Sequence, residues 1–120
     1  MIMFSFLKKK KTVAHIKLNG VIGNAGKFKQ GIDFAGQEEP IKKAFSLKKA
    51  SCVAISINSP GGSPVQSHMI YNFIRQEAKN NKKKVIVFAE DVAASGGYLI
   101  SCAGDEIYAN SSSIIGSIGV

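Results

Sequence analysis

The sequence predicts an α/β domain in which short parallel strands alternate with helices. Two observations support this fold class. Apolar runs typical of strands alternate with stretches of helical periodicity, and short strand–helix–strand units of this kind build parallel sheets. In addition, 120 residues with 45% hydrophobic content are enough for one domain with its own core, which must be mainly aliphatic because aromatic residues make up only 8%.

The first strand and the first helix are separated by a loop. Residues 12–18 alternate between apolar and polar types, which predicts a half-buried strand. Residues 23–36 contain several glycines and few apolar side chains, and we expect a loop there. Residues 38–49 predict a helix with Pro40 near its start and acids before bases, as the helix dipole favours. Its expected buried stripe consists of Ile41, Ala44, Phe45 and Leu47.

Two further strand–helix units follow. Residues 52–57 are rich in strand formers, and residues 64–79 predict an amphipathic helix. The apolar positions expected to share the buried face of this helix are Val65, Met69, Ile70, Phe73, Ile74 and Ala78. Residues 85–89 form a continuous apolar run, typical of a buried parallel strand. A short helix over 96–103 and a strand over 106–109 complete the pattern.

Charge is distributed unevenly along the chain. The net charge is +8, and all 16 lysine and arginine residues lie at or before Lys84. They form solvated runs without the interleaved aromatic residues of a nucleic-acid interface, so we expect no nucleic-acid partner. Residues 1–11 join a short apolar tip to four lysines, with no membrane-spanning length and no cleavable signal pattern. The pattern favours a frayed terminus, with weak peripheral contact with an anionic membrane surface as the alternative. We expect a protein that is membrane-associated or cytoplasmic.

The two cysteines do not indicate a disulfide framework. Cys52 and Cys102 lie among apolar neighbours, which predicts free, buried thiols. Neither these residues nor His15 and His68 have the spacing of a metal site, so we expect no metal and no cofactor.

Glycine clusters mark two of the predicted strand-to-helix junctions, where open α/β sheets place ligands. The clusters are Ser59-Pro60-Gly61-Gly62 and Ala93-Ala94-Ser95-Gly96-Gly97-Tyr98. Taken alone, the first predicts a structural turn, and Ser95 in the second predicts a helix N-cap, worth about 1 kcal/mol. The same placement would also expose the Ser95 hydroxyl beside backbone N–H groups that could bind an oxyanion.

Three motifs carry a resemblance to a known family. Residues 57–63, residues 91–98 and the final run Gly116-Ser117-Ile118-Gly119-Val120 resemble the signal peptide peptidase A family of serine peptidases, in order and in spacing. The resemblance implies the fold shared by Clp proteolytic subunits and crotonases, a homo-oligomer, and cleavage of residual signal peptides or other membrane-derived peptides. It also implies that residues 12–120 are a catalytic domain that is incomplete at its C-terminus.

The resemblance also implies roles for individual residues. Ser95 corresponds to the nucleophile, and Gly61, Gly62 and Gly96 correspond to the oxyanion hole. The family's general base is a lysine several dozen residues beyond the nucleophile. Because no lysine follows Lys84, we expect the base beyond residue 120 and a 120-residue chain that is inactive alone. Two alternatives stay open: a crotonase-type enzyme acting on acyl-coenzyme A, and an inactive oligomerisation or scaffold fragment.

Overall fold

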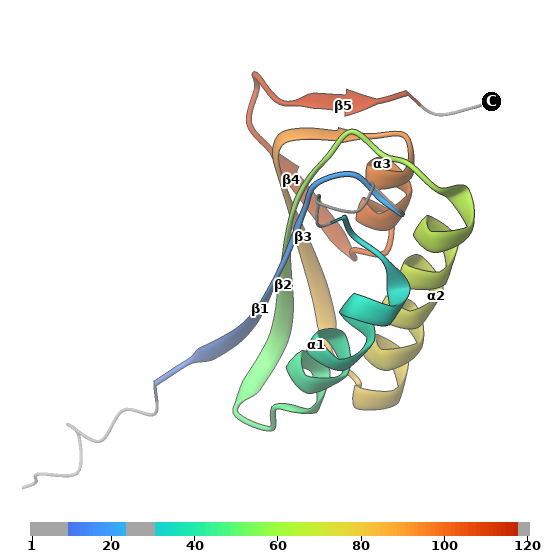
Figure 1. The fold of residues 1–120 in the computed structure, drawn as a ribbon. Coiled ribbons are helices and arrows are strands. Elements are labelled where there is room, and N and C mark those ends of the chain that lie inside the picture. Colours follow the sequence, from blue (N-terminus) through green and yellow to red (C-terminus); the bar gives the residue numbers. More distant parts are fainter. Residues whose placement is uncertain (1–9, 24–30, 118–120) are drawn as a thin grey trace, which may run out of the picture.

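The sheet is parallel throughout, as predicted. The computed structural model describes residues 10–23 and 31–117, in which three helices cover one face of a five-stranded sheet (Figure 1). In chain order the elements are β1 (Thr12–Asn19), α1 (Phe34–Ser46), β2 (Ala50–Ser59), α2 (Pro64–Asn81), β3 (Lys84–Ala94), α3 (Gly96–Ser101), β4 (Glu106–Ala109) and β5 (Ile114–Gly116). The strands lie in the order β1-β2-β3-β4, and β5 pairs with the last residues of β3, beyond β4.

The core lies between the sheet and the helices. Alternate residues of each central strand point towards the helices because successive side chains of a strand face opposite sides. The fully buried side chains of largest volume are Phe45, Leu18, Ile22, Ile32, Ile41, Ile55, Ile57, Ile70, Ile74, Ile100, Val53 and Val85. Phe45 is the single aromatic side chain among these, which confirms the prediction of an aliphatic core for the residues described.

The first helix begins earlier than predicted. Asp33 is its N-cap, and the Asp33 carboxylate accepts a hydrogen bond of 2.7 Å from the N–H of Gly36. The helix therefore includes residues 34–36, which were expected in a loop, and Pro40 lies inside it. Because α1 ends at Ser46, Leu47 lies outside the helix and is 43% exposed, so its place in the buried stripe was wrong.

Helix α2 follows the prediction in position but buries a narrower face. Ser63 caps it, Pro64 occupies its first position, and Ile70, Ile74 and Ala78 are buried. Val65 and Met69 are 66% and 40% exposed, which contradicts their expected burial. Ser67 of the first turn is buried together with these three residues, whereas Val65 and Met69 lie on the exposed side of the helix.

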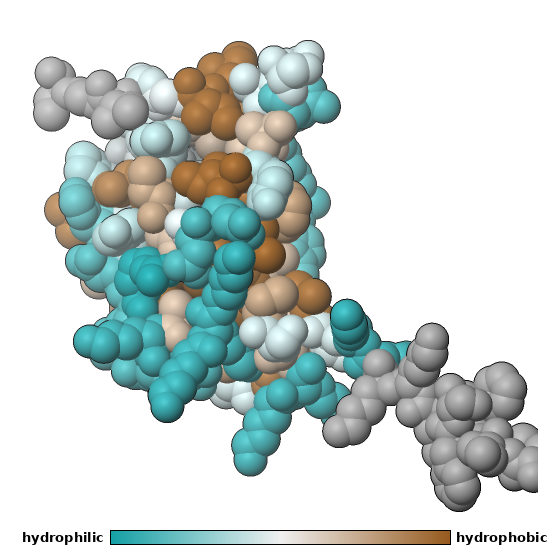
Figure 2. Space-filling model, turned by 180° about the vertical axis from the view of Figure 1, so that it is seen from behind, coloured by the Kyte–Doolittle hydropathy of each residue, from teal (hydrophilic) through white to brown (hydrophobic). Residues whose placement is uncertain are grey.

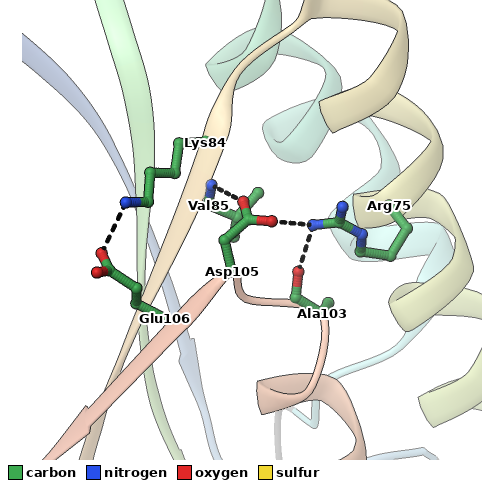
Figure 3. A network of polar contacts seen from close by, with 6 residues as sticks. All are labelled: Arg75, Lys84, Val85, Ala103, Asp105 and Glu106. Atoms are coloured by element: carbon green, nitrogen blue, oxygen red, sulfur yellow. Dashed lines mark hydrogen bonds and ion pairs between the residues drawn. The ribbon is translucent and has the colours of Figure 1, made fainter.

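A polar network fixes the start of β3 against α2. The N–H of Val85 donates to a carboxylate oxygen of Asp105 at 2.7 Å. Arg75 of α2 donates to the other carboxylate oxygen at 3.3 Å and to the carbonyl of Ala103 at 2.9 Å (Figure 3). These hydrogen bonds connect the residues between α3 and β4 to both α2 and β3.

Both cysteines are free, as predicted. Cys52 is half-buried, but Cys102 is exposed because it caps the end of α3, so the prediction of two buried thiols was wrong. No helix in the described ranges is long and apolar enough to cross a membrane. Residues 1–9 of the predicted N-terminal segment lie outside the described residues.

Candidate active site

Both glycine clusters lie at the same edge of the sheet. Gly61 and Gly62 follow the end of β2, and Ser95 follows the end of β3. Because β2 and β3 are parallel neighbours, their carboxyl ends bring the two turns together. A Cβ atom added to Gly61 would lie only 2.7 Å from the Cβ of Ser95, so the turns are in direct contact.

Ser95 adopts a backbone conformation that side chains rarely allow. Its φ is 54° and its ψ is −121°, a region that costs a non-glycine residue on the order of 1–3 kcal/mol. The Ser95 N–H donates to the carbonyl of Gly116 at 2.8 Å, and the Ser95 carbonyl accepts from the N–H of Leu99 at 3.1 Å. Ser95 occupies the N-cap position of α3, but its hydroxyl makes no capping hydrogen bond. The exposed hydroxyl is therefore not used for helix capping, the role that the cluster alone would favour.

The N–H group of Gly61 is already engaged. It donates to the hydroxyl of Ser59 at 3.1 Å, and Ser59 is fully buried. Gly61 has a φ of +104°, and an added Cβ would also lie 2.9 Å from the amide nitrogen of Gly96. Gly61 thus lets the turn approach the Ser95 loop closely, while its own N–H points to Ser59.

The N–H groups of Gly62 and Gly96 remain without a partner in the part of the chain that the structure describes. Ile22 bonds to both neighbours of Gly62: its N–H donates to the Gly61 carbonyl at 2.9 Å, and its carbonyl accepts from Ser63 at 2.8 Å. Since N–H groups alternate sides along an extended chain, the Gly62 N–H faces away from Ile22. Gly96 is the first residue of α3, so its N–H has no acceptor within the helix.

Small buried serines support the two turns. Ser59, Ser67 and Ser101 are the buried polar residues of the described chain. Ser67 donates to the carbonyl of Ser63 and Ser101 donates to the carbonyl of Gly97, each at 2.8 Å. An added Cβ on Gly97 would lie 2.7 Å from the Ser59 carbonyl oxygen, so only small residues fit at this level. The sequence analysis includes Ser59 in the first glycine cluster but assigns no supporting role to any of these serines, although Ser67 and Ser101 lie within a few residues of a cluster.

A bulge in β3 precedes Ser95. The pairing of Ile57 with Ala89 is followed by that of Ser59 with Ala93, so β3 contains extra residues opposite Asn58. The Asn58 side chain accepts from the N–H of Val92 at 3.2 Å, which satisfies a backbone group that the bulge leaves unpaired. Bulges are frequent beside active sites because they redirect the chain.

Comparisons with known proteins identify the family of the chain. Residues 77–120 match the sequence model described as Peptidase family S49. Protease 4 from Haemophilus influenzae is 43% identical over 83 residues, which cover 67% of this chain and 13% of that protein. The chain belongs to peptidase family S49.

Another relative has a different name. A Brucella melitensis protein named Na(+)/H(+) antiporter NhaA is 55% identical over 106 residues, which cover 88% of the S49 chain but 14% of that protein. The chain thus spans 14% and 13% of the lengths of these two curated relatives.

A solved structure shows the same fold. ClpP1 N165D from Listeria monocytogenes matches with a TM-score of 0.53 and 23% sequence identity, covering 76% of the S49 chain and 46% of that chain. This similarity confirms the predicted Clp-type fold of parallel strands and helices.

In the ranges 10–23 and 31–117, the S49 chain holds no cluster of metal-ligating side chains, and neither histidine is hydrogen-bonded to Ser95. No group of three or more His, Cys, Asp or Glu side chains in these ranges could hold a metal ion. His15 lies on β1, where its Nε2 is 2.7 Å from the hydroxyl of Ser56, and His68 is exposed on α2. The Ser95 hydroxyl itself makes no hydrogen bond to any described residue.

Proposed function

We propose that this S49 protein is a serine endopeptidase, with Ser95 as the nucleophile and the N–H groups of Gly62 and Gly96 as oxyanion donors. The observation that carries the proposal is Ser95, which is exposed, has a strained backbone, and forms no hydrogen bond through its hydroxyl to a described residue. Strained residues are concentrated at active sites, where the surrounding structure maintains them. Membership of a peptidase family supports peptide hydrolysis as the reaction.

In the proposed reaction a general base removes the proton of the Ser95 hydroxyl as its oxygen attacks the scissile carbonyl. Negative charge then develops on the carbonyl oxygen, where two preorganised N–H donors stabilise it. The base returns the proton to the leaving amine, and water hydrolyses the acyl-enzyme by the same steps. The resemblance implies a donor from Gly61 or Gly62; because the N–H of Gly61 is bonded to Ser59, we assign the donor to Gly62, and the proposed role of Gly61 is to allow close contact of the turns.

The base in this proposal is a lysine beyond residue 120. The lysines of the described chain lie at the opposite end of the sheet or on β1, away from Ser95. A lysine near the apolar core would have a lowered pKa and could accept the proton at neutral pH. The 120-residue chain is therefore expected to be inactive alone.

The proposed substrates are apolar, extended peptides such as residual signal peptides. Exposed apolar side chains occur on the elements that carry the two turns. Val65 in the first turn of α2 is 66% exposed, and Ile114 on β5, the strand that holds the N–H of Ser95, is 68% exposed. These surfaces suit apolar peptide side chains or further copies of the chain, and we expect a homo-oligomer.

The peptidase family match favours this function over the acyl-coenzyme A alternative. A scaffold fragment would not require a strained serine whose hydroxyl forms no hydrogen bond to a described residue.

The decisive experiment replaces Ser95 in a version of the protein that includes the base. Ser95→Ala should lower peptide hydrolysis at least about 10³-fold and abolish labelling by a fluorophosphonate probe, because both need the hydroxyl. Ser51→Ala is the matched control, since Ser51 is exposed at the other end of β2. Unchanged hydrolysis in the Ser95 variant would refute the assignment.

A further inference from the structure

Lysine residues gather at one end of the molecule. Because β1, β2 and β3 are parallel and α1 and α2 return between them, the strand starts and helix ends all lie at this end (Figure 1). Figure 2 shows the long hydrophilic side chains projecting from the same end. We call it the lysine end, and it is formed by Lys10, Lys11, Lys42, Lys43, Lys48, Lys49, Lys79, Lys82, Lys83 and Lys84.

Few acids neutralise the lysine end. Of the eight acidic residues in the sequence, Glu77, Asp105 and Glu106 lie near it. Asp105 pairs with Arg75 at 3.3 Å, and Glu106 pairs with Lys84 at 3.1 Å. The other lysines of this end form no ion pair with a described residue, so the end carries a large positive charge. The remaining acids lie in the half of the molecule nearer Ser95: Asp33, Glu38, Glu39, Glu90 and Asp91.

Helix dipoles account for only part of this arrangement. Lys43 and Lys79 lie in the last turns of α1 and α2, where a positive charge is favourable. Lys10, Lys48 and Lys49 belong to no helix, and together they line a pocket of about 600 Å³ beside the start of β1. Like charges brought together without acids raise the free energy of the fold, which suggests a partner that supplies negative charge.

We propose that the lysine end docks on the surface of an anionic lipid bilayer. Arg75 is the only arginine among the 16 basic residues of the sequence, and it is bonded to Asp105. Lysines act as point charges towards a diffuse anionic layer, whereas nucleic-acid recognition relies on arginine and on aromatic stacking. The exposed aromatic pair Phe88 and Tyr108 stacks on itself in the middle of the sheet, away from the lysine end.

The sequence that precedes the described residues supports a bilayer as the partner. Residues 1–7 are apolar apart from Ser5, and they are followed by Lys8 and Lys9. The chain enters the fold through Lys10 at the lysine end. An apolar segment next to a polybasic surface supplies the second signal that stable membrane attachment requires.

Docking in this orientation places the site away from the lipid. Strand β3 has 11 residues, and an extended chain advances about 3.3 Å per residue, so Ser95 lies roughly 30 Å from the lysine end. If Ser95 is the nucleophile proposed above, substrates reach it after they leave the bilayer.

The test measures sedimentation of the 120-residue chain with vesicles. Vesicles of phosphatidylcholine containing about 30% phosphatidylserine should bind the chain at about 0.1 M salt, and binding should be lost at about 0.5 M salt. The double variant Lys48→Gln/Lys49→Gln should bind about 10- to 30-fold more weakly, because each lysine at an anionic surface contributes about five-fold.

Lys17→Glu is the matched control. It lowers the net charge by the same two units, but Lys17 lies in the middle of β1, so its affinity should change less than about three-fold. Equal losses in the two variants would overturn the proposal, because net charge would then explain binding. Equal binding to pure phosphatidylcholine would also overturn it, as would binding to duplex DNA without binding to vesicles. Ser95→Ala should bind vesicles as the unchanged chain does, so this test is independent of the nucleophile assignment.

Discussion

Lys82 and Ser95 are both non-glycine residues with a positive φ, at 52° and 54°. Lys82 ends α2 with a ψ of 48°, an ordinary left-handed helix cap, and its N–H reaches the last turn of the helix. Ser95 begins α3 with a ψ of −121°, outside the left-handed helical region. Similar φ values therefore correspond to a common backbone conformation at Lys82 and to a strained one at Ser95, although the two residues lie at opposite ends of β3.

The difference shows what holds each turn. At Lys82 the end of the helix alone is enough to select the conformation. At Ser95 the conformation is maintained by hydrogen bonds to Gly116 and Leu99 and by contact with Gly61. The strain at Ser95 is thus maintained by several elements, whereas the conformation of Lys82 depends on one helix end.

The largest effect should come from adding a side chain at Gly62, in the glycine turn that packs against Ile22. In Gly62→Ala the new Cβ would overlap the backbone of Ile22, which cannot move aside as a flexible side chain can. The free energy of unfolding should fall by more than about 3 kcal/mol, measured by urea unfolding. Gly116→Ala is the control: Gly116 also has a positive φ, but no described atom lies within 4 Å of an added Cβ. Its loss should be about 1 kcal/mol, and equal losses would show that packing does not fix the turn.

The next largest effect should come from removing the strain at Ser95. Ser95→Gly should raise the free energy of unfolding by about 1–3 kcal/mol, because glycine adopts this conformation freely. Ser95→Ala keeps the Cβ atom and should leave stability nearly unchanged. The two variants compared by urea unfolding isolate the backbone strain. If they were equally stable, Ser95 would not be strained.

The same contrast explains what the sequence could predict. The strand and helix pattern is local, so the apolar runs predicted the parallel sheet. The glycine clusters after two of its strands then placed Gly61 and Ser95 at the same edge of that sheet. The pattern could not decide whether the Ser95 hydroxyl caps the helix or stays free, because this depends on a backbone conformation held in part by Gly116, which is distant in sequence. The hydrogen bond from the N–H of Gly61 to the Ser59 hydroxyl likewise depends on the geometry of the turn, which the residue types alone do not specify.

The errors at α1 and α2 have other causes. At α1 the helix begins after its N-cap, Asp33, but Gly36 lies within the first turn, and a glycine at this position is more typical of a loop. At α2 the helical period was right, but periodicity does not reveal how wide a face of the helix is buried. In the first turn of α2 the small Ser67 is buried, while Val65 is exposed.

A smaller effect is expected at the other end of β3. Lys82→Gly should raise the free energy of unfolding by about 1 kcal/mol, since a side chain in the left-handed helical region costs about that much. The gain should be smaller than that of Ser95→Gly under identical urea unfolding. A larger gain at Lys82 would reverse the distinction between the two turns.

The smallest effect concerns the ion pair that adjoins the Lys82 turn. Hydrogen bonding to Glu106, and then its negative charge, raises the pKa of Lys84 above the ordinary lysine value (Figure 3). A raised pKa in the folded state means that the stabilisation is complete at neutral pH and is lost as pH rises through the folded-state pKa. Glu106→Gln should therefore be slightly less stable than the unchanged chain at about pH 8, with the difference shrinking towards about pH 11. A constant difference over this range would mean that Glu106 acts by packing, whereas the predicted decline would show that the ion pair with Lys84 stabilises the pairing of β3 with β4.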